Sequence, residues 1–195
     1  MKRLFILVSL LLPLVFCCSK KVDLNQTALE LCQYIPDHEL KPEAKEFMTP
    51  EFYATLEEAF NAPVVDYGEI GDNEWLNYFV TGNGGSTPSF SVKSVTQTSK
   101  NTATAVINVK DIWEEGTEPV GEGADYEISL VRVNRKWLLD DFDNKKAECI
   151  DYVELMRNKY KSGELLEWMI TEDNLTEYIP DFKQRVADFY QKYGE

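Results

Sequence analysis

The chain has 195 residues, of which 44% are hydrophobic and 28% charged, and its formal net charge is −14. It is too apolar for a disordered protein, and 10 Gly and 8 Pro are too few for a low-complexity one. No basic block could neutralise a run of phosphates, so we expect no nucleic-acid partner. These numbers indicate one acidic globular domain and name no reaction.

The N-terminus has the pattern of a cleaved leader. Lys2 and Arg3 precede an apolar run over residues 4–16, which is shorter than the ~20 residues that a membrane-spanning helix needs. Pro13 would also break a helix near the end of this run. The pattern predicts a signal peptide over residues 1–17.

Two adjacent cysteines, Cys17 and Cys18, directly follow the apolar run. This arrangement resembles the lipobox of bacterial lipoproteins, in which such a cysteine is acylated and becomes the first mature residue. Cys18 fits better, because Cys17 supplies the small residue before the cut, whereas Phe16 would be a bulky misfit for cleavage one residue earlier. The resemblance implies a lipidated tether over residues 18–23 that fastens the chain to a membrane.

The same resemblance implies a place in the bacterial cell envelope. Residues 19–21 are Ser-Lys-Lys and lack the acidic run of some surface-displayed lipoproteins, so we expect the outer membrane, facing the periplasm. The alternatives are an ordinary secreted protein and a retained hydrophobic anchor.

The first part of the mature chain is patterned for helices. Apolar residues at helical spacing predict a helix that begins at Leu24 and ends before Pro36. A second helical stretch is predicted over residues 41–48. Thr49 and Pro50 predict the start of a third helix, because a capping hydroxyl and a proline in the first turn are typical of helix N-termini.

The middle of the chain is patterned for strands. Alternation around residues 90–92 slips in phase at Ser94, as a β-bulge would produce. Three further strands are predicted over residues 102–109, 126–133 and 136–142. We expect a long acidic loop with three glycines over residues 114–125, and a tight turn at Asn134 and Arg135 that makes the adjacent strands antiparallel.

The C-terminal part returns to helical patterning, over residues 149–160, 165–170 and 182–193. Helices, then strands, then helices predict an α+β fold, with helices on one face of a curved antiparallel sheet. We expect one domain over residues 24–145, and the helices of residues 146–195 as an extension of it.

Residues 126–142 resemble part of a known fold. An apolar strand, a polar turn and the motif Lys-Trp-x-x-Asp-Asp at residues 136–141 are similar to the closing hairpin of cystatin-like cone domains. This is the superfamily of nuclear transport factor two and ketosteroid isomerase, and it includes small uncharacterised bacterial lipoproteins. The resemblance covers residues 24–142 and implies a sheet curled around a helix, with a concave pocket. Such pockets serve enzymes, ligand binders and interaction surfaces alike.

The candidate pocket residues are one acid–tyrosine pair and a group of aromatic side chains. Asp66 and Tyr67 are the nearest match to the base and donor of a ketosteroid-isomerase type of mechanism. The aromatic residues could line a groove for a sugar or an apolar ligand, and core packing is the alternative. These aromatic residues are Trp75, Tyr78, Trp113, Tyr126 and Trp137.

The remaining cysteines, Cys32 and Cys149, could form a disulfide in an oxidising compartment. The alternative is two separate buried thiols that act as small apolar residues. Both reside on the apolar faces of predicted helices, and this pattern favours neither interpretation.

Metal and cofactor chemistry has little support in the sequence. His38 is the only histidine, and we expect a solvated loop residue rather than a zinc ligand or a catalytic base. Asp140 and Asp141 do not continue into an EF-hand, because Lys145 and Lys146 occupy the positions that a calcium loop needs for a ligand and a glycine. We expect no metal and no cofactor.

Three functions remain open at this point. The first is a lipid-anchored, non-catalytic envelope protein that binds a small ligand or a protein through a concave pocket. The second is an isomerase or dehydratase that uses a pocket aspartate. The third is an inhibitory or immunity-like protein that acts through its acidic surface.

Overall fold

A computed structural model describes residues 22–36, 39–62 and 86–162, together with residues 184, 187, 188, 191 and 192. The predicted leader, the cysteine expected to be lipidated (Cys18) and the short helix expected over residues 165–170 lie outside these ranges. The elements follow in the order α1 (Leu24–Cys32), the 3-10 helix η1 (Pro42–Glu46), α2 (Pro50–Asn61), β1 (Thr87–Gln97), β2 (Thr102–Ile112), β3 (Val120–Val133), β4 (Lys136–Phe142) and α4 (Lys145–Lys161).

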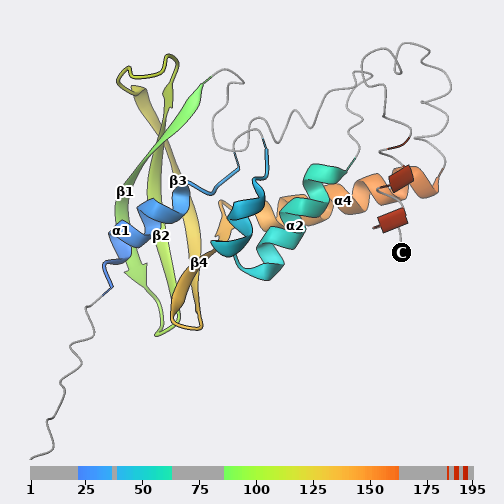
Figure 1. Cartoon of the computed structure of the whole chain (residues 1–195), viewed down its shortest axis with the longest axis horizontal. Coiled ribbons are helices and arrows are strands. Elements are labelled where there is room, and N and C mark those ends of the chain that lie inside the picture. The colour runs from blue at the N-terminus through green and yellow to red at the C-terminus, as the bar shows by residue number, and fades with distance from the viewer. Residues whose placement is uncertain are drawn as a thin grey trace, which may run out of the picture.

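The four strands form one open antiparallel sheet in the order β1-β2-β3-β4, and the fold is α+β. Figure 1 shows α1 lying across the sheet, with α2 and α4 side by side next to β4. The bulge predicted near Ser94 is confirmed, because the register with β2 shifts between Val92 and Ser94. The tight turn is confirmed as well: Asn134 and Arg135 have φ of 50° and 71°, as hairpins joined by two residues require.

The loop expected over residues 114–125 is shorter than predicted, since β3 already begins at Val120. Gly121 and Gly123 have φ of 80° and 75°, and the register between β2 and β3 shifts beside them. In the sequence alone, two closely spaced glycines suggest a loop. Here they let a strand bulge and continue.

The helical stretch expected over residues 41–48 is a 3-10 helix of five residues. The chain then leaves the helical path to pair with the edge of β4. The amide of Thr49 donates to the carbonyl of Leu139 at 2.8 Å, and the amide of Leu139 donates to the carbonyl of Phe47 at 2.9 Å. These bonds cover part of an edge strand, whose free amides would otherwise be open to pairing with another chain.

One hydrophobic core joins the sheet to the helices. The clean alternation of β2 buries every second side chain, as predicted: Ala103, Ala105, Ile107 and Val109. The helices complete the same core with side chains that share one stripe of each helix: Ala28, Leu31, Phe52, Leu56, Ala59, Cys149, Val153 and Met156. An ion pair between Arg157 and Glu58 also links α4 to α2. In the described part of the chain, no helix is long and apolar enough to cross a membrane.

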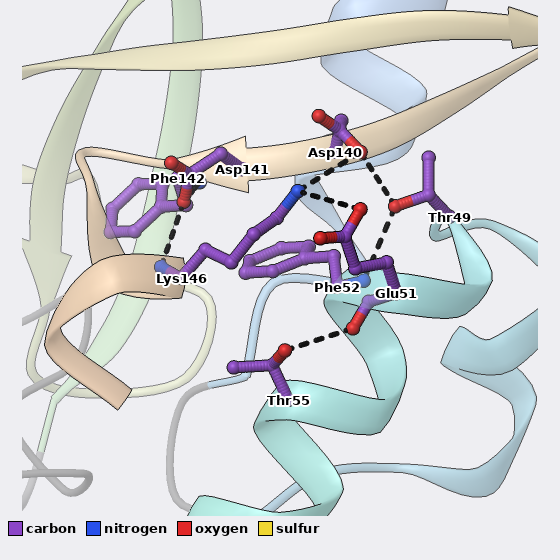
Figure 2. Close-up of polar contacts among 8 residues, drawn as sticks. All are labelled: Thr49, Glu51, Phe52, Thr55, Asp140, Asp141, Phe142 and Lys146. Carbon is purple, nitrogen blue, oxygen red and sulfur yellow. Dashed lines mark hydrogen bonds and ion pairs between the residues drawn. The ribbon is translucent and has the colours of Figure 1, made fainter. Parts of the chain in front are cut away.

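A polar cluster fixes the point where α2 meets β4 and α4 (Figure 2). Thr49 caps α2, as predicted: its Oγ1 accepts a hydrogen bond from the amide of Phe52 at 3.3 Å and donates one to Asp140 at 2.7 Å. The Nζ of Lys146 lies 3.3 Å from Asp140 and 3.8 Å from Glu51. The buried threonine therefore connects two elements that are far apart in the sequence.

Asp141 caps the opposite helix. Its Oδ1 accepts from the amide of Phe142 at 2.8 Å and from the amide of Lys146 at 2.9 Å, at the N-terminus of α4. The paired aspartates at the end of β4 are thus used to join the sheet to two helices.

Candidate functional site

A pocket lies between the C-terminal end of α1 and the first residues of β1. It encloses about 390 Å³, which is within the range of small-molecule sites in proteins. Its walls come from two segments about fifty residues apart in the sequence: Gln33, Tyr34, Ile35, Pro36, Glu39 and Lys41 from the first, and Thr87, Pro88 and Phe90 from the second.

The sheet side of the pocket belongs to the same face that packs against α1. Phe90 pairs with Val109, a core residue of β2, and paired residues of antiparallel strands point to the same face. Pro88 is two residues away and points to that face too. The half-buried Pro88 and Phe90 therefore present apolar surface to the pocket beyond the end of the helix.

Tyr34 forms a wall whose position is fixed by a stack of side chains. Its ring lies on the ring of Phe47 with centroids 3.7 Å apart and planes 6° apart. The Nζ of Lys136 lies 4.4 Å from the centroid of the Phe47 ring and donates to the carbonyl of Glu46 at 2.7 Å. The stack of lysine, phenylalanine and tyrosine reduces the entropy that Tyr34 would lose on contact with a ligand.

The rim of the pocket is polar and carries both signs of charge. Glu39 and Lys41 are exposed, as is Gln33, whereas Ile35 and Pro36 are buried behind them. A carboxylate accepts hydrogen bonds, an ammonium donates them and an amide does both. The arrangement can hold a ligand that has an apolar body and polar or charged groups at one edge.

Several residues predicted for a pocket lie outside the described ranges: Asp66, Tyr67, Trp75 and Tyr78, and also His38. The other three are spread over the sheet. Trp113 is 50% exposed after the end of β2, and Trp137 is buried in the core. The ring of Tyr126 packs on that of Phe142 with centroids 5.1 Å apart, and burial raises the pKa of its phenol. None of these three lines the pocket beside Tyr34.

Cys32 and Cys149 are both buried, and both are free thiols in the structure. Burial raises the pKa of each thiol to about 12. Since the thiolate is the reactive form, neither cysteine is a nucleophile at neutral pH. The two side chains serve as small apolar residues of the core.

Metal ligands do not gather in the part of the chain that the structure describes. No group of three or more His, Cys, Asp or Glu side chains there is arranged to hold a metal ion. The acids at the end of β4, which come closest to a calcium loop in sequence, are bonded to Thr49, Lys146 and helix amides instead.

The pocket residues carry a weak signal in the sequence. Tyr34 and Ile35 fall in the last turn of the helix predicted to end before Pro36, whereas α1 already ends at Cys32. Pro88 precedes a predicted strand, so each segment by itself suggests ordinary structure. Only the contact between α1 and β1 brings the two segments together. Prolines and aromatic rings concentrated at the ends of elements are the one feature that could have indicated them.

Comparison of the chain with models of protein families, with curated proteins and with solved structures finds no match. The resemblance to cone domains therefore stays a prediction that depends on the closing hairpin. The site must be interpreted from its own geometry.

Proposed function

We propose that this chain is a lipid-anchored cell-envelope protein that binds a small ligand in the pocket beside Tyr34 and catalyses no reaction. The observation that carries the proposal is a pocket of about 390 Å³ whose aromatic wall is already stacked in place. Its lining offers apolar surface and charged groups at the rim, which is what a site for a small amphipathic ligand needs.

The expected ligand is small and amphipathic. A flat apolar part fits against Pro88 and Phe90 on the sheet and against Tyr34 on the other side. Its polar edge would meet Glu39 and Lys41 at the rim, so a molecule with both an ammonium and a carboxylate gains from both. Sugars and aromatic zwitterions are the ligand classes with this chemistry.

The membrane anchor and the cone-like curvature are parts of the same proposal. The anchor is supported by the apolar run and Cys18, because an acidic protein (net charge −14 for the whole chain) gains nothing electrostatically from an anionic membrane and needs lipid to hold it there. The cone is supported by the order of elements and by a helix against one face of the antiparallel sheet. A concave sheet face beside that helix would be the place for the pocket.

Binding is tested by titrating the ¹⁵N-labelled protein with three probes that share one ring system: tryptophan, tryptamine and indole-3-acetate. We expect amide shifts confined to residues 33–41 and 87–90, and tightest binding for tryptophan, because it alone carries both charges. Phe90→Ala removes apolar lining and should abolish the shifts. Val95→Ala, a partly buried residue of the same strand away from the pocket, is the matched control and should leave them unchanged.

The pocket proposal fails if all three probes leave these amides unshifted, or if Phe90→Ala and Val95→Ala bind alike. The anchor is tested separately, by feeding labelled palmitate to cells that express the full chain. Label should enter the wild type and the Cys17→Ser variant and be absent from Cys18→Ser. Incorporation into Cys18→Ser would show that another residue carries the lipid.

A further inference from the structure

The hairpin of β2 and β3 carries a surface that the pocket does not use. Its loop, residues 113–119, projects past the helices in Figure 1. Trp113 is 50% exposed and Val120 is 58% exposed. Val120 lies opposite Asp111 in the register, and Trp113 follows Asp111 by two residues, so both apolar side chains stand at the same end of the hairpin.

The base of this hairpin is held firmly. Asn108 is 5% exposed, and its Nδ2 donates to Oδ1 of Asp125 at 2.8 Å and to the carbonyl of Glu122 at 3.3 Å. The Nζ of Lys93 lies 2.6 Å from the same Asp125, which ties β1 to β3. These bonds to Lys93 and Asn108 lower the pKa of Asp125, so it stays charged at neutral pH.

The strands and the loop are close-packed as well. A Cβ added at Gly123 would lie 2.4 Å from the carbonyl oxygen of Val109, so the two backbones touch there. In the loop, the amide and the hydroxyl of Thr117 donate to the carbonyl of Glu114 at 3.0 and 2.7 Å. A tip of this kind is preorganised, because little conformational entropy is left to lose on binding.

The residues of the tip carry charge of one sign, and a lysine, Lys110, lies against Gly123 at its base. Between Lys110 and Arg132 the sequence contains seven acidic residues and no basic one. Four of these acids are exposed glutamates around the apolar pair: Glu114, Glu115, Glu118 and Glu122. None of the four forms an ion pair with another residue that the structure describes. The tip therefore combines a large aromatic side chain with a negative rim.

We propose that this tip, formed by residues 113–122, docks a partner protein that presents lysine or arginine side chains around an apolar one. Tryptophan is enriched among the residues that dominate binding energy at protein interfaces, and Trp113 would be such an anchor. The glutamates would set the charge of the partner and speed its approach at low salt. Charge complementarity selects a basic polypeptide over an acidic membrane or a nucleic acid, which the tip would repel.

The test uses the full chain and fluorescein-labelled hexapeptides. The probe is Lys-Lys-Leu-Leu-Lys-Lys, and its two controls replace the lysines by glutamates or the leucines by serines. Anisotropy should show binding of the first peptide only, and the affinity should fall as salt is raised to the physiological level. Binding of the serine peptide as tightly as the leucine peptide would overturn the proposal, because the apolar anchor would then contribute nothing.

Two variants locate the contact. Trp113→Ala should weaken binding of the probe about tenfold or more, whereas Leu155→Ala on α4, an apolar side chain of equal exposure, should not change it. Replacing the four tip glutamates by glutamine should weaken binding and flatten its salt dependence. The matched control is the same replacement at exposed glutamates elsewhere: Glu30, Glu43, Glu46 and Glu154.

The outcomes separate the tip from the protein's overall charge. If both sets of four glutamine substitutions weaken binding equally, the peptide responds to net charge and the tip is not a site. If Trp113→Ala binds like the wild type while its circular dichroism and unfolding free energy are also unchanged, the proposed anchor is wrong.

Discussion

Thr49 offers the sharpest test of how the sheet and helices are joined. Thr49→Val keeps the shape of the side chain and removes its hydroxyl, so both the cap on Phe52 and the bond to Asp140 are lost. Loss of an N-cap costs about 1 kcal/mol. Loss of a hydrogen bond to a carboxylate costs about another 1 kcal/mol when, as here, Lys146 still neutralises that carboxylate. We expect the unfolding free energy from urea denaturation to fall by about 2 kcal/mol.

Two companion variants make this reasoning refutable. Thr49→Ser keeps the hydroxyl and should lose less than half as much stability as Thr49→Val. In an Asp140→Ala background, Thr49→Val should lose only the capping part, about 1 kcal/mol, so that a double-mutant cycle yields a coupling of about 1 kcal/mol between the two side chains. A coupling of zero, or equal losses for serine and valine, would show that the polar cluster of Figure 2 does not hold the junction.

Two further predictions concern the backbone and the buried thiols. Gly123→Ala should lower the unfolding free energy by more than about 2 kcal/mol, because its Cβ would meet the backbone of Val109. Gly116 is also at positive φ but faces open space, so Gly116→Ala should lower it by only about 1 kcal/mol. Equal losses of unfolding free energy in urea would contradict this. Burial raises the pKa of Cys32 and Cys149 from the ordinary 9.0 to about 12, so the folded state keeps protons that the unfolded state releases above pH 9. Their contribution to stability is therefore complete below pH 9 and falls by about 1.4 kcal/mol per thiol and pH unit as the pH rises toward 12. The Cys32→Ala/Cys149→Ala variant should show a shallower decline over this range, and an identical slope would refute the assignment.

Much of the fold could be predicted because its elements follow apolar periodicity. The helix capped by Thr49, the alternation of residues 102–109 and the bulge near Ser94 are local patterns, and the structure confirms each of them. The exceptions depend on tertiary contacts. Residues 47–49 leave the helical path only because the edge of β4 is there to pair with, and no local pattern contains that information.

The site was harder to predict for a related reason. The excess of aromatic residues is compatible with a groove or with core packing. Trp137 belongs to the core and Tyr126 packs against it, because burial of a large ring contributes more than exposure at a groove would. The walls of the pocket are instead Tyr34 and Phe90, which are fifty-six positions apart in the sequence and gain their role only when α1 crosses β1. Rings of the same type therefore serve as core or as lining according to contacts that composition does not reveal.

The central claim is that the pocket beside Tyr34 takes a small ligand, and equilibrium dialysis against a metabolite extract of the host organism tests it most directly. Mass spectrometry should find a compound enriched on the protein side for the wild type and not for Phe90→Ala, which removes apolar lining from the pocket. No enrichment with the wild type, or the same compound enriched by both proteins, would contradict the claim.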